Sequence, residues 1–200
     1  MSGNGKISWE VGAGIANEIL ELVTPFCVEM CVAGSIRRKV SEIGDIEMVA
    51  IPAYEDTGQI AMFKGMGEQI NLLGKGMDGL AENGTFSKDK DGSIVRWGDR
   101  YRKFFYRGVA VDLFMATEAN YGLIKMIRTG SVDFSKWMVT KRIKGGGLPN
   151  HMRVNEGYLW MDGKIVPVRT EAELFDLCYV NYVSPIKRGL ESKSEWGVHG

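Results

Sequence analysis

An aspartate inside an apolar run is the feature that most constrains the fold of this chain. Residues 109–115 read Val-Ala-Val-Asp-Leu-Phe-Met, a composition typical of a strand, with Asp112 at the centre. A carboxylate buried in such a strand is costly unless it is paired with a cation or bound to a metal ion. The sequence therefore predicts a strand that carries an acidic side chain toward a positively charged partner.

A second acidic pair follows a Gly-Ser turn upstream. Asp45 and Glu47 are two residues apart at the start of the apolar run 46–51, so on a strand both would point to one face. Carboxylates on one face are ligands that suit Mg²⁺, and the turn at Gly34-Ser35 offers backbone N–H groups to a phosphate. Metal and triphosphate would meet at one place, which is the chemistry of nucleotidyl transfer.

The overall charge is balanced, but basic residues are segregated. The chain has 25 Lys and Arg against 25 Asp and Glu, which argues mildly against nucleic-acid binding. Residues 125–153 nevertheless hold seven Lys and Arg against one acidic residue, Asp133, and residues 86–110 are also basic. These regions predict either a surface that faces phosphates or ordinary solvated faces, and charge alone leaves both interpretations open.

Several classes of protein are disfavoured. The three cysteines, Cys27, Cys31 and Cys178, have no CxxC spacing, so we expect free thiols in a reducing compartment rather than disulfides or structural zinc. His151 and His199 are the only histidines in the sequence, so a histidine-based catalytic triad or zinc site has almost no residues to form it. With no apolar run long enough to span a bilayer and no signal-peptide pattern, we expect a cytoplasmic protein without a membrane partner.

Hydrophobic periodicity predicts an α+β chain in two parts. For the first part we expect a helix over 9–23 ended by Pro25, strands over 28–33 and 46–51, and a weak helical pattern over 59–73. The glycine-rich stretch 74–93 favours loops and turns, and 101–107 with 109–116 a hairpin around Gly108.

The pattern changes near residue 118, where we place a domain boundary. Residues 119–143 indicate helices with a turn at 129–131. Three short strands are expected over 152–154, 158–161 and 165–168, followed by a helix over 170–180 that Thr170 would cap.

Four segments, in order along the chain, resemble the DNA polymerase β-like family (family X) of nucleotidyltransferases. They are residues 33–38 (AGSIRR), residues 44–47 (GDIE), residues 111–114 (VDLF) and residues 128–131 (RTGS) with Phe134. The end of the chain, from Glu173 to Pro185, is similar to the C-terminal segment of the family. The resemblance implies a palm with a mixed sheet and helices over residues 1–118 and a small α+β thumb over residues 119–200.

The resemblance also implies roles for particular residues. Asp45, Glu47 and Asp112 would be the catalytic residues and would hold two Mg²⁺ ions, which Mn²⁺ could replace. Six residues would contact the nucleotide: Gly34, Ser35, Arg38, Gly44, Gly130 and Ser131. Arg128, Lys136, Lys141 and Arg142 would contact DNA.

The implied activity is a DNA-directed DNA polymerase that adds dNMP to a 3′-hydroxyl and releases pyrophosphate, as in gap-filling repair. Its partners would be gapped or primer-template DNA and a dNTP, and we expect a monomer. The chain departs from the family pattern at Glu47, Ala110, Ile127-Arg128 and Val139. Glu47, Ile127-Arg128 and Val139 leave open a template-independent or RNA-directed nucleotidyltransferase. A non-catalytic nucleic-acid-binding module is a further alternative, although the chain retains all three acids.

Overall fold

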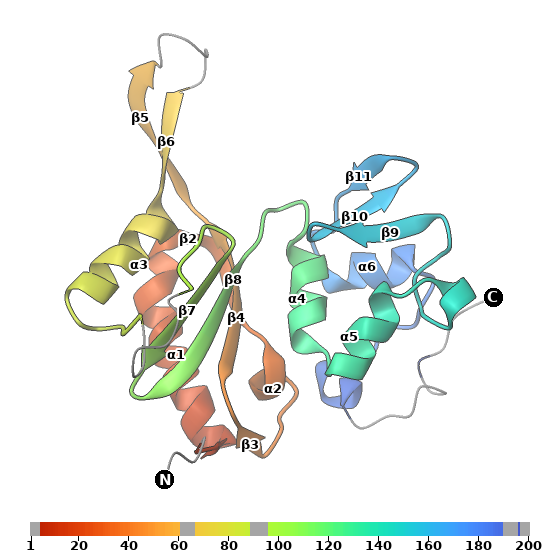
Figure 1. Ribbon diagram of the computed structural model, residues 1–200, viewed down its shortest axis with the longest axis horizontal. Helices are drawn as coiled ribbons and strands as arrows, with labels where there is room; N and C mark the ends of the chain where they lie inside the picture. Colours follow the sequence, from red (N-terminus) through yellow and green to blue (C-terminus); the bar gives the residue numbers. More distant parts are fainter. Residues whose placement is uncertain (1–4, 61–66, 89–95, 190–195, 197–200) are drawn as a thin grey trace.

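The computed structural model describes residues 5–60, 67–88, 96–189 and 196. Helices and strands alternate in two parts that lie side by side, the first containing the larger sheet and the second a smaller one (Figure 1). The expected α+β class is confirmed. The N-terminal part means residues 5–118 below, and the C-terminal part means the described residues from 119 onward.

A mixed four-stranded sheet forms the centre of the N-terminal part. Its strands are β2 (Cys27–Val32), β4 (Ile46–Pro52), β8 (Val109–Met115) and β7 (Tyr101–Tyr106), in the order β2-β4-β8-β7. β4 and β8 run parallel, and the two outer pairings are antiparallel. The parallel pair joins strands that are far apart in the sequence, as the predicted mixed sheet requires.

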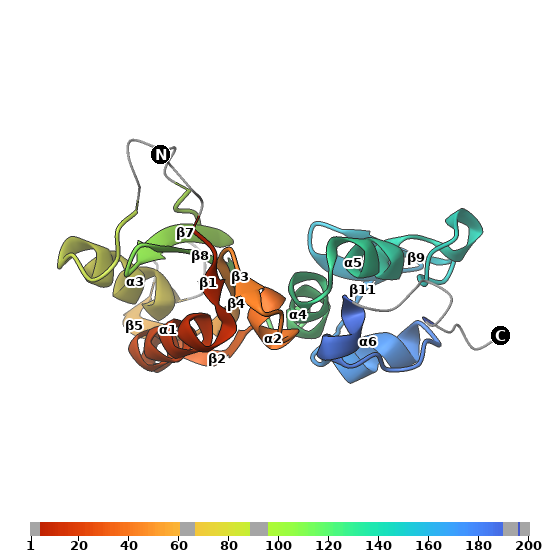
Figure 2. The ribbon, with the colours of Figure 1, turned by 90° about the horizontal axis from the view of Figure 1, so that it is seen from below.

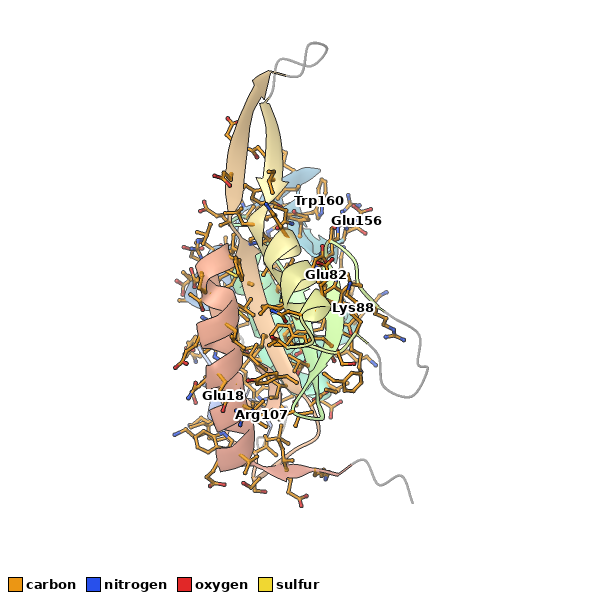
Figure 3. The ribbon with its side chains drawn as sticks, turned by 90° about the vertical axis from the view of Figure 1, so that its left-hand side faces the viewer. Glu18, Glu82, Lys88, Arg107, Glu156 and Trp160 are labelled. Atoms are coloured by element: carbon orange, nitrogen blue, oxygen red, sulfur yellow. The ribbon has the colours of Figure 1, made fainter. Side chains whose placement is uncertain are left out.

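One face of this sheet is covered by the helices α1 (Trp9–Val23) and α3 (Leu72–Glu82) (Figures 2 and 3). Alternate residues of β4 and β8 point into this core because successive strand side chains face opposite sides. The core positions of the two strands are Ile46, Met48, Ala50, Val111 and Leu113. Glu47 and Asp112 therefore belong to the other face, which looks toward the C-terminal part.

Helix α1 forms where the apolar spacing predicts it. The Ser8 side chain caps its first turn by accepting a hydrogen bond from the Val11 backbone N–H, and Ile15, Ile19 and Val23 are buried along one stripe. Glu18 on this helix forms an ion pair with Arg107 in the β7–β8 turn, 3.0 Å between Oε2 and Nη2 (Figure 3). This ion pair connects α1 to the β7–β8 hairpin at the edge of the sheet.

The C-terminal part has its own core. The helices α4 (Tyr121–Thr129), α5 (Val132–Val139) and α6 (Glu171–Leu177) pack with a small antiparallel sheet of order β11-β10-β9. Its strands are β9 (Met152–Asn155), β10 (Tyr158–Met161) and β11 (Lys164–Val166). Thr170 caps α6 in a reciprocal pair with Glu173, which confirms that predicted cap.

Short elements complete the chain. They are β1 (Ile7–Ser8), α2 (Gly34–Arg37), β3 (Glu42–Ile43) and three 3₁₀ turns at Thr24–Phe26, Arg142–Lys144 and Pro185–Arg188. α2 begins at Gly34, in the predicted Gly34-Ser35 turn. It contacts α4, so it joins the two parts (Figure 2).

Two predictions for the middle of the chain are wrong. The weak helical pattern over 59–73 belongs instead to a hairpin, β5 (Tyr54–Ile60) and β6 (Gly67–Asn71), that projects from the N-terminal part (Figure 1). Residues 61–66 of that pattern lie outside the described residues.

The predicted loop over 74–93 is wrong up to residue 82, which belongs to helix α3; turns follow over residues 83–86 as predicted, and residues 89–93 lie outside the described part. Asn71 caps this helix by accepting from the Gly74 backbone N–H at 2.9 Å, and Leu73 and Met77, one turn apart, are fully buried. Tertiary burial of this stripe outweighs the poor helix propensity of its glycines.

No helix in the described ranges is both long and apolar enough to cross a membrane.

Candidate functional site

Three carboxylates lie at the start of the parallel strand pair. Glu47 of β4 and Asp112 of β8 are register partners, so the two side chains leave neighbouring strands on the same face. Neighbouring strands are about 4.8 Å apart. Asp45 directly precedes β4, and it is close enough to the other two acids for its charge to act on Glu47 and for the charge of Asp112 to act on it. Glu47 and Asp112 thus lie on neighbouring strands, and Asp45 lies directly before the first of these strands.

These carboxylates interact electrostatically. Burial, followed by the negative charge of Asp45, raises the pKa of Glu47 to about 7. Burial and the charge of Asp112 likewise raise the pKa of Asp45 above its ordinary value. Like charges held together in a half-buried place favour the neutral form of each acid. A cation bound among them would relieve this repulsion.

A divalent cation suits this donor set. Within the described residues, no three His, Cys, Asp or Glu side chains already lie close enough together to hold an ion as they stand. The donor chemistry nevertheless fits Mg²⁺ or Mn²⁺, since all three groups are carboxylates, whose hard oxygen atoms these ions prefer. Asp45, Glu47 and Asp112 are the residues that would hold such an ion.

Gly34 lies directly against Glu47. Its φ is +58°, a conformation that favours glycine, and a Cβ at this position would overlap the Glu47 side chain. The adjacent Ala33 backbone N–H donates to the Glu47 carbonyl oxygen at 2.8 Å. The turn that precedes α2 is therefore fitted to the strand that carries Glu47.

Arg38 ties this turn to the end of helix α4. Its Nη1 donates to the carbonyl oxygens of Thr129 and Gly130 at 2.9 and 3.0 Å. Burial lowers the pKa of Arg38, whereas the nearby charges of Glu47 and Asp45 act in the opposite direction. Arg38 is thus close to the acids and in contact with Gly130, a second residue expected at the nucleotide.

The other residues expected at the nucleotide have different surroundings. Ser35 is half-buried in the first turn of α2, and Gly44 is exposed in open space before Asp45. The Ser131 hydroxyl accepts from the Phe134 backbone N–H as the cap of α5 and donates to the Arg188 carbonyl at 2.7 Å. Ser131 therefore has a structural role in the fold, and its contact with nucleotide stays a prediction.

Arg128 on α4 reaches back to the acidic face of the sheet. Its guanidinium lies 3.7 Å from the centre of the Phe114 ring, and its charge lowers the pKa of Glu47 against the larger effect of burial. Arg128 and Asp112 both line a cavity of about 730 Å³ between the two parts. A cation and a carboxylate thus face one space that could receive a charged substrate.

The three other basic residues expected at DNA lie farther along the C-terminal part. Lys136 is exposed on α5, and Lys141 lines a small hollow with Trp160. Arg142 donates from Nη2 to the Cys178 carbonyl oxygen at 2.6 Å, so its guanidinium is engaged within the protein. Their contacts with DNA stay predictions.

Sequence reasoning missed two groups beside this site. Tyr101 on β7 donates its hydroxyl to Oδ1 of Asp112 at 2.6 Å; burial and this bond raise the pKa of Tyr101 to about 12. Arg37, for which the sequence predicted no contact, donates to Glu171 and to the Thr129 hydroxyl. The predicted hairpin around Gly108 indicates that Tyr101 and Asp112 lie on neighbouring strands, but it does not predict their hydrogen bond. No local sequence signal pairs Arg37 with Glu171.

Compared with known proteins, the chain matches no protein-family model and no curated protein sequence.

Proposed function

We propose that this protein is a nucleotidyltransferase that uses divalent cations to transfer dNMP from a dNTP to a 3′-hydroxyl, and that it resembles the DNA polymerase β-like family in this respect. The observation that carries the proposal is the register pairing of Glu47 with Asp112, with Asp45 beside them. Arg38 and Arg128 add positive charge around these acids. This combination suits a substrate that carries phosphates and arrives with a metal ion.

In the proposed reaction, the 3′-oxygen forms a bond to the α-phosphorus of the dNTP. The bond from that phosphorus to the bridging oxygen breaks, and pyrophosphate leaves. Asp112, whose side chain is 16% exposed beside the cavity, accepts the proton of the hydroxyl. Divalent cations, when bound by the three carboxylates, supply charge neutralisation for the triphosphate and lower the pKa of the hydroxyl.

The residues of the turn and of α4 would orient the nucleotide. Gly34 lets the chain approach Glu47 closely, and Arg38 would offer its guanidinium to the β- and γ-phosphates. Phosphoryl transfer depends mainly on positioning and charge stabilisation, so it requires no covalent nucleophile. The small number of histidines and the unreactive cysteine pattern are compatible with this chemistry.

Primer extension on gapped DNA tests the proposal. The wild-type protein should incorporate dNTP in the presence of Mg²⁺ or Mn²⁺, and Asp112→Ala should lose at least about 100-fold in rate. Asp133→Ala, which removes an exposed carboxylate on α5, is the matched control and should retain wild-type activity. Equal incorporation by wild type and Asp112→Ala would reject the mechanism.

Template-independent or RNA-directed transfer is the second candidate. Arg128 stacks on Phe114 at the place where the family usually shapes the sugar pocket with aromatic residues. Val139 packs against the C-terminal core where a template-contacting arginine was expected. A matrix of dNTPs and rNTPs against all four template bases, at fixed salt, separates the candidates. Incorporation that ignores the template base, or that prefers rNTPs, would favour the second.

A further inference from the structure

Tyr101 is joined to the third carboxylate by a short hydrogen bond. Its hydroxyl donates to Oδ1 of Asp112 at 2.6 Å, within the range of hydrogen bonds from a hydroxyl to a charged carboxylate. The two residues are on adjacent antiparallel strands, β7 and β8. The bond therefore connects the outer strand of the sheet to the proposed metal ligand.

The Tyr101 ring is itself held in place. Tyr101 and Phe114 are register partners, and their rings stack with centroids 5.0 Å apart and planes at 27°. Phe114 in turn carries the Arg128 guanidinium at 3.7 Å. A tyrosine has few rotatable bonds, so a stacked ring leaves its hydroxyl little freedom to move. The donor is thus fixed before any substrate binds.

Lys103 also reaches Asp112. It lies directly opposite Asp112 in the strand register, and its Nζ is 3.9 Å from the same oxygen, Oδ1. This distance exceeds hydrogen-bond length, and the lysine side chain is 37% exposed, so the pair is weak. Both contacts fall on Oδ1, which leaves Oδ2 outside this pair of interactions.

We propose that Tyr101 is a positioning residue of the nucleotidyl-transfer site, whose hydroxyl orients the Asp112 carboxylate to receive a divalent cation. This inference rests on the proposed function. A neutral donor suits the role because it fixes one carboxylate oxygen without neutralising the charge that attracts the cation. Hydrogen-bond partners of metal ligands typically contribute about 10- to 100-fold in metal affinity or activity.

The chain supplies a matched control on the same strand. Tyr106, also on β7, donates its hydroxyl to Oε2 of Glu18 at 3.0 Å. Tyr101→Phe and Tyr106→Phe each remove one hydroxyl and one tyrosine–carboxylate bond, and both keep the ring and its packing. Only Tyr101→Phe removes a bond to a proposed metal ligand. An effect that comes merely from losing a tyrosine–carboxylate bond should therefore appear equally in both variants.

Mn²⁺ binding, followed through the electron paramagnetic resonance signal of the free ion, is the first measurement. We expect Tyr101→Phe to bind Mn²⁺ about 10- to 100-fold more weakly than the wild type, and Tyr106→Phe to bind within twofold of the wild type. Asp112→Asn removes the charge of a proposed ligand, so the Mn²⁺ binding that this variant weakens is the binding at the site. Wild-type affinity in Tyr101→Phe would overturn the proposal, as would equal weakening in both tyrosine variants.

Primer extension at a series of Mg²⁺ concentrations is the second measurement. We expect Tyr101→Phe to need about 10-fold more Mg²⁺ for half-maximal rate or to lose about 10-fold in kcat, with KM for dNTP changed less than about threefold. A rise in KM alone would contradict a positioning role.

If Mn²⁺ binding weakens as expected but even the wild type incorporates no nucleotide, the proposed function fails and the role of Tyr101 in metal binding stands. If extension is normal in wild type and in Tyr101→Phe, the proposed function stands and the role of Tyr101 is overturned.

Discussion

Arg37 and Glu171 form a two-point contact between the two parts of the protein. Arg37 Nη1 donates to Oε1 at 2.9 Å, and Nη2 donates to Oε2 at 2.5 Å. Arg188, which is fully buried, donates to the same Oε1, and Arg37 also donates to the Thr129 hydroxyl. One carboxylate on α6 thus connects the turn after β2 to the C-terminal end of the described chain.

Replacing this carboxylate should destabilise the protein strongly. Glu171→Gln would leave the buried Arg188 and the half-buried Arg37 without their counter-charge, and we expect a loss of about 3–5 kcal/mol in the free energy of unfolding by urea. Glu42→Gln is the control, because Glu42 pairs with Lys6 at 3.2 Å where both side chains are more than half exposed. That change should cost less than about 0.5 kcal/mol. Equal losses in the two variants would contradict the importance of the buried contact.

The same contact predicts a pH dependence of stability. Burial alone would raise the pKa of Glu171, but hydrogen bonds from Arg37 and Arg188 outweigh burial and lower it below the ordinary value of 4.5. Because the folded pKa is lowered, the stabilisation is complete above about pH 4.5 and is lost as the pH falls through the folded value. Urea unfolding between about pH 6 and pH 3 should therefore give a steeper decline for the wild type than for Glu171→Gln. Parallel curves would show that Glu171 does not supply this dependence.

Gly34 should be intolerant of any side chain. Gly34→Ala places a Cβ against Glu47 and forces alanine to adopt a φ of +58°, which alone costs about 1–2 kcal/mol. We expect lower stability and weaker Mn²⁺ binding, because Glu47 must move. Gly14→Ala, in helix α1, is the control, since nothing lies within 4 Å of its Cβ position, its φ is not positive and it has no expected role at the site. A tolerated Gly34→Ala would mean that the turn adjusts without disturbing Glu47.

Divalent cations should stabilise the folded protein. A cation bound among Asp45, Glu47 and Asp112 would offset the burial and the repulsion that together raise the pKa values of Asp45 and Glu47. At a concentration 100 times its dissociation constant, such an ion adds about 2.7 kcal/mol to the free energy of unfolding. The Tm should rise with Mn²⁺ and fall again with EDTA. The rise should be much smaller in Asp112→Asn than in Asp133→Asn, and an equal rise in both would place the ion elsewhere.

Much of the fold follows from local patterns. The alternation of side chains along a strand predicts that Glu47 and Asp112 face away from the apolar core. The parallel pairing of β4 and β8 then makes the two acids neighbours. The helix α1 and the cap at Thr170 were equally readable, because their signals are contained in a few adjacent residues. Whether the boundary near 118 separates independent domains stays a prediction.

The rest depends on tertiary contacts that no local pattern contains. Helix α3 was missed because its glycines obscure the buried stripe of Leu73 and Met77. The bond from Tyr101 to Asp112 depends on hairpin register and on a stacked ring, and the bond from Arg37 to Glu171 joins residues 134 positions apart. Neither bond has a spacing signature in the sequence.

The parallel pairing of β4 with β8 also decides when during synthesis the acids can meet. Glu47 leaves the ribosome long before Asp112, and the connecting chain includes the projecting β5–β6 hairpin and α3. Long-range pairing of this kind forms late because closing a large loop is entropically unfavourable. A nascent chain halted before β8 would therefore contain Asp45 and Glu47 but not Asp112. The proposed cation site would be incomplete even if other parts of the fold had already formed.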